Sequence, residues 1–416
     1  MSKYIINGGR KLYGKIDVQS AKNAVLPIMA ASCMCEGVVT IRNSPKIADC
    51  KSMLNILERL GSSTHSTERG VVIDNTNMKN SEIPPDLARE LRSSIFLLGP
   101  ILSRFGYAKI AYPGGCEIGL RPIDMHLKGL RELGVKIKEE GGYIYCDASN
   151  MTGNYVELDL PSVGATENVM MAGVGANGIT VIGNAAKEPE IVDLQNFLIK
   201  CGAKITGAGT STITIEGRKN LKGVEYSPIK DRIVAGTYLL AVCMCGGELT
   251  LNGANYDDLR SLTSKLSKYA CKIVPNSDNI YIKVNERMSA VDIIETSPYP
   301  GFPTDLQAQT VAMLSTASGM SVMVENMFET RFKYIPELVK MGAKIVVRGQ
   351  NAVIKGVKTL KGAEVLAHDL RGGAALVLAG LCAEGQTIVD NVHHILRGYE
   401  NLDAILRSVG ADITRE

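Results

Sequence analysis

The stretch of sequence that decides the fold is Asn177-Gly178-Ile179-Thr180-Val181-Ile182-Gly183-Asn184. A glycine directly before a run of β-branched residues indicates the end of a helix followed by a strand, because glycine adopts the left-handed backbone that closes a helix. The pattern recurs about every 70 residues, and such a period indicates an internal repeat. The other copies lie at 36–43, 105–110, 247–252, 319–324 and 385–391.

A second marker follows the next, more polar helix of each copy. In five of the six copies it is a residue pair that ends in glycine, and the fourth copy has Ala270-Cys271 at this place. Each unit is therefore predicted to contain an apolar helix, a strand, an amphipathic helix, and then one or two strands. The five glycine pairs are Leu60-Gly61, Leu133-Gly134, Cys201-Gly202, Met341-Gly342 and Val409-Gly410.

The sixth unit stops at Glu416, before its final strand, and the missing strand occurs at the N-terminus. There residues 4–8 precede 12–14 with the spacing that is also found within 215–223 and within 354–362. We therefore predict that the N-terminal strand completes the last unit.

Two domains are expected, because 416 residues exceed what one typical core accommodates. Six units in two domains predict an α/β fold with three βαβαβ-type units in each domain. The predicted boundaries are 22–229 for the first domain and 1–21 plus 230–416 for the second. The alternative is a single solenoid of six units, and the completing N-terminal strand argues against it.

Composition excludes several classes of protein. A net charge of +3 argues against wholesale nucleic-acid binding but permits a local basic cleft for a small anionic substrate. Residues 1–7 lack the apolar core of a signal peptide, and the uncharged run 306–324 is interrupted by Gly, Ser, Thr and Gln. The ten cysteines show no C-x-x-C metal spacing, so we expect a reduced, cytoplasmic protein without a metal or a membrane span.

The turn Pro113-Gly114-Gly115-Cys116 predicts a reactive cysteine. Little side-chain bulk covers Cys116, and Arg121, five residues further on, can hold the thiolate or an anion beside it. Exposure and a low pKa make a cysteine nucleophilic. The alternative is that Cys116, one of ten cysteines, is small core filler.

The six apolar helices begin with polar residues, and helix N-termini favour phosphate and carboxylate groups. For Ser162, Thr304 or Asp369 taken alone, an N-cap is the better explanation. Lys22, Arg92 and Arg371 are harder to explain in this way, since a cation at a helix start opposes the helix dipole and calls for an anion nearby. Together with Arg121, Arg331 and Arg397 they predict a cationic cleft for a substrate that carries several negative charges. The helix starts are 20–23, 92–94, 162–168, 231–232, 304–305 and 369–371.

Over its whole length the chain resembles the family of UDP-N-acetylglucosamine enolpyruvyl transferases of bacterial peptidoglycan synthesis. This resemblance implies two inside-out α/β domains with threefold pseudosymmetry. One departure follows Arg331, where Lys333-Tyr334 replaces the Met-His pair of many relatives, and we expect no change in chemistry from it. The motifs that carry the resemblance are Lys22-Asn23, Arg92, Pro113-Gly114-Gly115-Cys116 with Arg121-Pro122, 162–166, 303–305, 328–332, 369–371 and 397–400.

The resemblance also implies the reaction and the roles of the residues. The enolpyruvyl group of phosphoenolpyruvate passes to the 3′-hydroxyl of UDP-N-acetylglucosamine and phosphate is released, with no cofactor or metal. Asp305 would face the sugar hydroxyl, and Cys116 would be the acid toward phosphoenolpyruvate and could form a covalent adduct with it. The other residues with implied catalytic roles are Lys22, Arg397 and Asp369. The implied substrate-binding residues are Lys22, Asn23, Arg92, Arg121, Pro122, Ile123, Asp124, Met125, Ser162, Val163, Gly164, Asp305, Met327, Phe328, Arg331, Arg371 and Arg397.

Two rival functions were weighed against this interpretation. The sister enzyme acts on shikimate 3-phosphate, but its Asn-Ala-Gly-Thr-Ala-Met-Arg signature is absent from this sequence. A non-catalytic sensor of nucleotide sugars would not need the set of Lys22, Cys116, Asp305 and Arg397. The expected partners are therefore the two substrates alone, with a monomer as the favoured oligomeric state.

The cysteine hypothesis predicts which thiol reacts first. An epoxide phosphonate such as fosfomycin should alkylate Cys116 before the other nine cysteines, because its thiol is predicted to be exposed and to have a lowered pKa. Mass mapping of the labelled protein measures this order. An adduct found first on another cysteine would refute the assignment.

Overall fold

The computed structural model describes residues 2–114, 123–218, 220–267 and 271–416. With these gaps, the chain divides into two compact units. Within the described residues, the terminal unit contains 2–19, 230–267 and 271–416, and the middle unit contains 20–114, 123–218 and 220–229.

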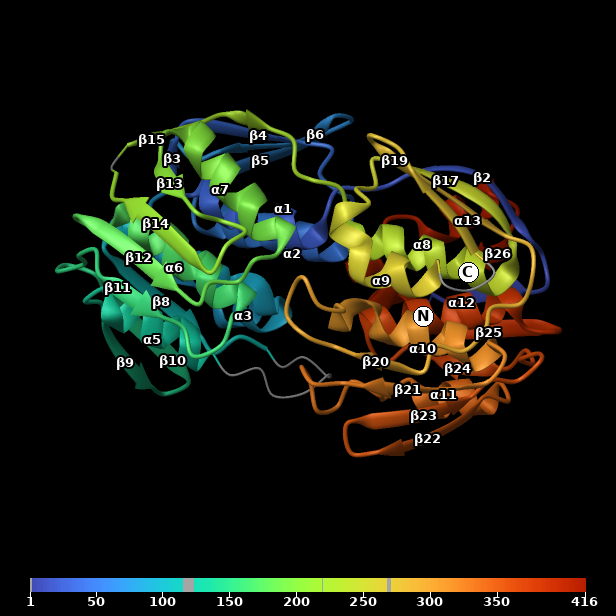
Figure 1. Cartoon of the computed structure of the whole chain (residues 1–416). Helices are drawn as coiled ribbons and strands as arrows, with labels where there is room; N and C mark the ends of the chain where they lie inside the picture. The colour runs from blue at the N-terminus through green and yellow to red at the C-terminus, as the bar shows by residue number, and fades with distance from the viewer. Residues whose placement is uncertain (1, 115–122, 219, 268–270) are drawn as a thin grey trace. The chain divides into compact units, whose positions relative to one another are not determined.

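The middle unit repeats the predicted order of helices and strands three times (Figure 1). Its elements are α1 (Lys22–Ser32), β3 (Cys35–Glu36), β4 (Val38–Arg42), α2 (Ala48–Arg59), β5 (Ser63–Thr67), β6 (Gly70–Asp74), β7 (Glu82–Ile83), α3 (Pro85–Glu90), η1 (Arg92–Leu97), α4 (Leu98–Phe105), β8 (Tyr107–Ala111), α5 (Asp124–Glu132), β9 (Lys136–Glu140), β10 (Tyr143–Asp147), β11 (Tyr155–Glu157), α6 (Val163–Gly175), β12 (Ile179–Gly183), α7 (Pro189–Cys201), β13 (Lys204–Thr206), β14 (Thr212–Glu216), β15 (Leu221–Lys222) and β16 (Glu225–Tyr226), where η denotes a 3₁₀-helix.

The terminal unit follows the same order. Its elements are β1 (Tyr4–Asn7), β2 (Leu12–Asp17), α8 (Arg232–Cys245), β17 (Gly247–Asn252), η2 (Asp257–Leu259), α9 (Arg260–Leu266), β18 (Cys271–Pro275), β19 (Asn279–Val284), β20 (Ile293–Glu295), η3 (Thr304–Leu306), α10 (Gln307–Thr316), β21 (Met320–Val324), α11 (Ile335–Lys340), β22 (Lys344–Arg348), β23 (Asn351–Lys355), β24 (Glu364–Leu366), α12 (Leu370–Cys382), β25 (Gln386–Asp390), η4 (Val392–Arg397), α13 (Leu402–Ser408) and β26 (Asp412–Arg415).

Six four-stranded sheets share one topology, which confirms the repeat. The orders are β16-β4-β6-β5, β7-β8-β10-β9 and β11-β12-β14-β13 in the middle unit, and β18-β19-β17-β2, β20-β21-β23-β22 and β24-β25-β1-β26 in the terminal unit. In each sheet one edge strand pairs in parallel with the strand that follows the apolar helix, and the remaining pairs are antiparallel. Gly178, directly before β12, has φ 97°, as the repeat pattern predicts for a glycine that precedes a strand.

The N-terminal strand completes the last sheet, as predicted. β1 lies between β25 and β26 and pairs antiparallel with both, with Ile6 opposite Thr387 on one side and Ile413 on the other. This pairing joins the two ends of the chain in one sheet, so the alternative of a single open solenoid is wrong.

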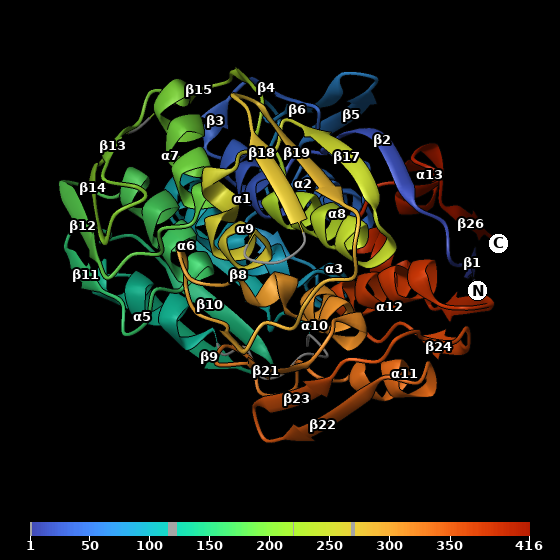
Figure 2. The ribbon, with the colours of Figure 1, turned by 45° about the vertical axis from the view of Figure 1, so that its right-hand side comes forward.

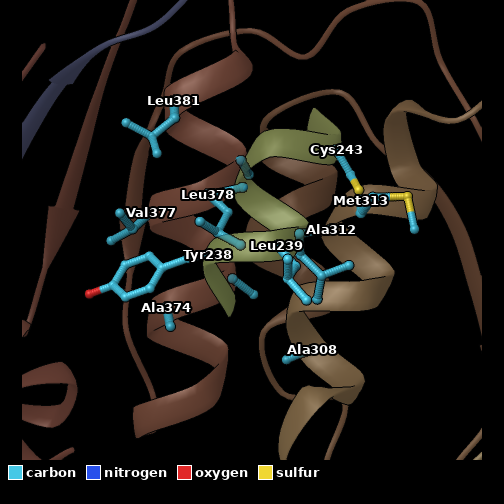
Figure 3. Close-up of a cluster of buried hydrophobic side chains, with 14 of the residues drawn as sticks. Tyr238, Leu239, Cys243, Ala308, Ala312, Met313, Ala374, Val377, Leu378 and Leu381 are labelled. Carbon is cyan, nitrogen blue, oxygen red and sulfur yellow. The ribbon is translucent and has the colours of Figure 1, made fainter. Parts of the chain in front are cut away.

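The apolar helices occupy the interior of each unit and the sheets lie outside them. In the terminal unit α8, α10 and α12 pack against one another through Tyr238, Leu239, Ala312, Val377 and Leu378 (Figure 3). Figure 2 shows strands β17 and β19 beside α8, and both strands contact this helix. Every residue from 371 to 381 of α12 is buried, whereas β23 alternates between buried and exposed residues. The inside-out arrangement implied by the resemblance is therefore confirmed.

The central position of β1 predicts that Ile6 contributes strongly to stability. Its side chain is fully buried and faces Gly380 of α12. Ile6→Ala should lower the free energy of unfolding by about 2–5 kcal/mol, since it leaves a cavity in a packed core. Urea unfolding followed by circular dichroism measures this loss. Asn7→Ala, at an exposed position of the same strand, is the matched control; an equal effect of both changes would contradict a central role for β1.

Candidate functional site

Asp305 is held between two arginines at the start of the α10 segment. Arg331 Nη2 donates to Asp305 Oδ1 at 2.7 Å, and Arg371 Nη2 donates to Asp305 Oδ2 at 3.2 Å. The Asp305 side chain is 25% exposed, whereas Arg331 is 2% and Arg371 is 5% exposed. The structure thus brings together three predicted site residues from three separate segments of the terminal unit, and we call them the Asp305 clamp.

The burial of the two arginines depends on this carboxylate. Burial alone lowers the pKa of Arg371, but attraction to Asp305, and next to Tyr399 and Asp231, outweighs it and raises this pKa above its ordinary value. A buried charge is tolerated when it is paired and hydrogen-bonded. Asp305 supplies that pairing for both guanidinium groups.

Three of the acidic and polar helix-start residues act as N-caps. Asp369 Oδ1 accepts from the backbone N–H groups of Arg371 and Gly372, both at 2.9 Å, and Asp231 Oδ1 accepts from those of Ile233 and Val234. The Ser162 hydroxyl accepts from Ala165 N at 3.4 Å. The cap interpretation is therefore confirmed for Ser162 and Asp369.

Thr304 does not cap a helix. Its hydroxyl instead donates to Glu325 Oε2 at 2.9 Å, and Pro303 occupies the cap position of η3. The alternative interpretation of Thr304 as an N-cap is wrong. Thr304 turns away from the helix start because a buried carboxylate accepts its hydrogen bond.

Arg397 is the last residue of η4 and is half-buried. The segment that follows it is fixed by Gln19, whose Nε2 donates to Gly398 O at 3.0 Å and whose Oε1 accepts from Glu400 N at 2.9 Å. Next in sequence, the ring of Tyr399 lies 5.5 Å from the guanidinium carbon of Arg371. Arg397 thus ends a short helix, and the segment after it is anchored beside the Asp305 clamp.

In the middle unit, Lys22 begins α1 and forms a salt bridge of 2.5 Å with Asp49 of α2. Both side chains are largely buried, at 12% and 5% exposed. The anion that a cation at this helix start calls for is thus supplied, at least in part, by the protein. Asn23 follows within the first turn and is half-buried.

Arg92 begins η1 and acts on a histidine that the sequence analysis did not single out. His126, on α5, is buried, and its pKa is lowered to about 3, first by burial and then by the positive charge of Arg92. Asn168 of α6 lies 2.7 Å from His126 Nδ1, and it donates through Nδ2 to Ile95 O. A neutral His126 therefore ties the start of α5 to η1 and α6.

Gly164 is needed where it stands. A Cβ added there would lie 2.9 Å from His126 Cε1 and 3.0 Å from Phe96 Cε1. The predicted residues Ser162, Val163 and Gly164 thus form a helix start packed against this histidine. Ile123 is buried directly before α5, Asp124 is exposed, and Met125 is half-buried.

A buried acid also lies on α6. Glu167 is buried, and neither of its carboxylate oxygens has a hydrogen-bond partner among the described residues. Burial first, and then the nearby Glu190 and Glu188, raise its pKa well above the ordinary value. The surroundings of Glu167 therefore favour its neutral form over its charged form.

Other predicted residues are placed singly or lie outside the description. Met327 is 38% exposed, and the ring of Phe328 lies 5.5 Å from the guanidinium carbon of Arg331. Cys116, Arg121 and Pro122 fall outside the described residues, so their assignments stay predictions.

The pair Lys333-Tyr334, which departs from the family pattern, has one exposed and one buried residue. Tyr334 is buried and donates to Gln307 Oε1 at 3.1 Å, whereas Lys333 is exposed. Tyr334 therefore packs under the start of α10 as part of the core.

Gln19 and His126 were not predicted as parts of the site, and Tyr399 was named only within the 397–400 motif. Their contacts join segments that are far apart in the chain, and no local pattern marks Gln19 or His126. Among residues 2–114, 123–218, 220–267 and 271–416, no group of His, Cys, Asp or Glu side chains is arranged to hold a metal ion. None of the helices within these ranges has the length and apolar character that a membrane crossing requires.

Comparisons with known proteins point to one family. A family model described as "EPSP synthase (3-phosphoshikimate 1-carboxyvinyltransferase)" matches residues 6–406. The chain is 56% identical over 415 residues to UDP-N-acetylglucosamine 1-carboxyvinyltransferase 2 of Caldanaerobacter subterraneus subsp. tengcongensis, with 100% of both chains covered. It is 48% identical over 417 residues to the enzyme of the same name from Clostridium tetani, again with full coverage of both.

Solved structures share the fold at low sequence identity. The enolpyruvyl transferase NikO from Streptomyces tendae has a TM-score of 0.89 at 24% identity, covering 100% of this chain and 98% of that chain. EPSP synthase from Acinetobacter baumannii has a TM-score of 0.76 at 16% identity, with 100% of both chains covered. These likenesses confirm the predicted fold class.

The buried His126 predicts an acid-dependent loss of stability. Its pKa is about 3 in the folded protein and about 6.5 in the unfolded chain. Below about pH 6.5 only the unfolded chain takes up this proton, so stability is lost as the pH falls toward 3 and is unaffected above 7. His126→Gln should remove this loss, which amounts to about 2 kcal/mol at pH 5.

Urea unfolding at pH 7 and pH 5 measures the difference. His65→Gln, at an exposed histidine of β5, is the matched control. A wild-type and a His126→Gln protein with the same pH dependence would show that His126 is not held neutral.

Proposed function

We propose how the residues of this chain carry out the reaction of its family. The chain belongs to the EPSP synthase family, and within it to the UDP-N-acetylglucosamine 1-carboxyvinyltransferases. The reaction transfers the enolpyruvyl group of phosphoenolpyruvate to the 3′-hydroxyl of UDP-N-acetylglucosamine and releases phosphate. It is the first committed step of peptidoglycan synthesis.

The reaction needs a base and an acid. In the addition step the sugar hydroxyl loses its proton, its oxygen bonds to C2 of phosphoenolpyruvate, and C3 gains a proton. In the elimination step C3 loses a proton and the C2–phosphate oxygen bond breaks, which regenerates the double bond. Groups positioned on opposite sides of the reacting carbon serve these proton transfers best.

Asp305 is the base that we propose for the sugar hydroxyl, and the Asp305 clamp is the observation that carries this proposal. Arg331 and Arg371 fix both carboxylate oxygens, so little orientation entropy remains to be lost in the transition state. A quarter of the side chain is exposed, and a ligand can therefore reach it.

The charge of the clamp also suits an anionic substrate. Its two guanidinium groups are almost fully buried, so water screens their positive charge only weakly. One carboxylate and two guanidinium groups leave the clamp with a net positive charge, which suits phosphoenolpyruvate or a diphosphate.

The remaining roles follow from the family resemblance. Lys22, Arg121 and Arg397 would hold the phosphate and carboxylate of phosphoenolpyruvate, and Cys116 would protonate its C3. Asp369 would support the cleft as the cap of α12. The nucleotide sugar would lie along Arg92, 121–125, 162–164 and 327–328.

We further propose that the two compact units correspond to the two predicted domains, 22–229 and 1–21 with 230–416. The protein would work as a cytoplasmic monomer on its two substrates, without nucleic acid or a membrane. Size-exclusion chromatography with light scattering would measure the oligomeric state directly.

A phosphate-release assay tests the function. Phosphate should appear only when phosphoenolpyruvate and UDP-N-acetylglucosamine are both present, and shikimate 3-phosphate should not replace the nucleotide sugar. Phosphate release with phosphoenolpyruvate and shikimate 3-phosphate, but not with the nucleotide sugar, would assign the protein to the sister activity. Binding of the nucleotide sugar without phosphate release would indicate a sensor.

Asp305→Ala separates the base from the acid in the same assay. Turnover should fall by about 10² or more, the usual scale for the loss of a positioned general base. Covalent capture of phosphoenolpyruvate by Cys116, measured by mass spectrometry, should persist because it does not require removal of the sugar's proton. Asp305→Asn, which keeps the side-chain volume between the two arginines, controls for collapse of the clamp. Near-normal turnover in both variants would make Asp369 the better candidate.

A further inference from the structure

Glu325, directly after β21, is a fully buried carboxylate whose four hydrogen bonds are all made within the terminal unit. Its Oε1 accepts from Thr296 Oγ1 at 3.0 Å, from Met327 N at 2.8 Å and from Phe328 N at 3.1 Å. Its Oε2 accepts from Thr304 Oγ1 at 2.9 Å. A buried carboxylate with this many donors is rigidly held, because each lost bond would leave charge uncompensated in the interior.

The internal repeat shows that the turn after β21 does not require an acid. The residue directly after the corresponding strand has a left-handed backbone in four other repeats, where it is Asn43 after β4, Asn184 after β12, Gly253 after β17 and Asn391 after β25. Glu325 and Tyr112, which follows β8, depart from this pattern in both residue type and backbone conformation. Tyr112 is exposed, whereas Glu325 is fully buried, and a buried acid that the turn does not require points to a function.

Glu325 is connected to Asp305 by two routes. Thr304, bonded to Oε2, is the residue directly before Asp305. Phe328, whose N–H is bonded to Oε1, lays its ring against Arg331, and Arg331 donates to Asp305. The two routes form a closed ring of contacts through Glu325, Thr304, Asp305, Arg331 and Phe328.

Thr296 reinforces the route from Glu325 Oε1 to Met327 and Phe328; we call this route the Oε1 arm and the route from Oε2 to Thr304 the Oε2 arm. Its hydroxyl donates to Glu325 Oε1 and also accepts from Asn326 N at 2.9 Å. The backbone N–H groups of three consecutive residues, 326–328, are thus held by one threonine and one carboxylate. Met327, at the centre of this segment, is exposed and can contact a ligand.

We propose that Glu325 is a positioning residue of the transfer reaction whose two carboxylate oxygens have separate tasks. Oε1 shapes the 326–328 segment against the sugar, and Oε2 sets the orientation of Asp305 through Thr304. This inference rests on the proposed function, because it assigns the two arms to binding of the nucleotide sugar and to turnover.

Two isosteric substitutions separate the arms. Thr304→Val removes the donor to Oε2 and should lower kcat about 10-fold with little change in KM for UDP-N-acetylglucosamine, since a hydrogen bond to a charged group is lost beside the base. Thr296→Val removes a donor to Oε1 and the acceptor for Asn326 N, and should raise KM for UDP-N-acetylglucosamine about 10-fold with little change in kcat. Thr304→Ser and Thr296→Ser keep the hydroxyl and should restore each constant.

Two more variants keep the test sharp. Glu325→Gln retains one oxygen for the three Oε1 donors, but its amide N–H can only donate to the Thr304 hydroxyl. The bond from Thr304 to a charged acceptor is therefore lost, and kcat should fall in the same direction as in Thr304→Val. Thr263→Val is the matched control, because the buried Thr263 hydroxyl bonds only to Leu259 O in the described structure and lies outside the ring of contacts. Thermal melting of every variant identifies any that fails to fold, in which case the Ser and Gln variants decide.

The outcomes are distinct. A wild-type protein that releases no phosphate would overturn the proposed function and this inference with it. An active wild type would overturn this inference alone if Thr304→Val and Thr296→Val behaved like Thr263→Val, or if both changed kcat and KM together. Opposite effects on the two constants, each reversed by serine, would establish the two separate arms.

Discussion

Enclosure of apolar helices is the constraint on which the rest of the structure depends. A helix such as α12, with every residue from 371 to 381 buried, has no face that can be left in water. It must be surrounded by other helices and by sheets, and only its ends reach the surface of the unit. Polar residues in these helices are therefore concentrated at their first turns, and the candidate site is assembled there.

Charge balance then decides what those helix starts can hold. Lys22, Arg92 and Arg371 were expected to bind an anionic substrate, but the protein supplies part of the counter-charge itself. Asp49 pairs with Lys22 and Asp305 pairs with Arg371. A cation at a helix start does require an anion nearby because of the helix dipole. That anion can belong to the protein as well as to a ligand. Because two arginines share Asp305, an excess of positive charge still remains in the clamp.

The fold could be predicted from the sequence because the same pattern of helix and strand signals recurs six times. A single glycine-strand pattern is a weak signal. Six copies at a regular spacing, together with a first strand that has the spacing of the last unit, are compatible with few folds. The site was predictable only in part. Asp305, Arg331 and Arg371 were suggested by helix starts and by resemblance, whereas Gln19, His126 and Glu325 act through contacts between distant segments that leave no local pattern. The preference of Thr304 for Glu325 over a cap is one such case, since it depends on a carboxylate 21 residues away.

The central place of β1 in the last sheet also has a consequence for synthesis of the protein. Asn7 and its partner Gln386 are 379 residues apart, so β1 leaves the ribosome long before its two neighbours in the sheet, β25 and β26, have been synthesised. The middle unit can fold during that time, because domains generally fold as units when they emerge. The terminal unit cannot close this sheet until β26 has been synthesised. An N-terminal strand of four residues, with alternate side chains destined for the core, is therefore the part of the newborn chain that remains longest without its native partners.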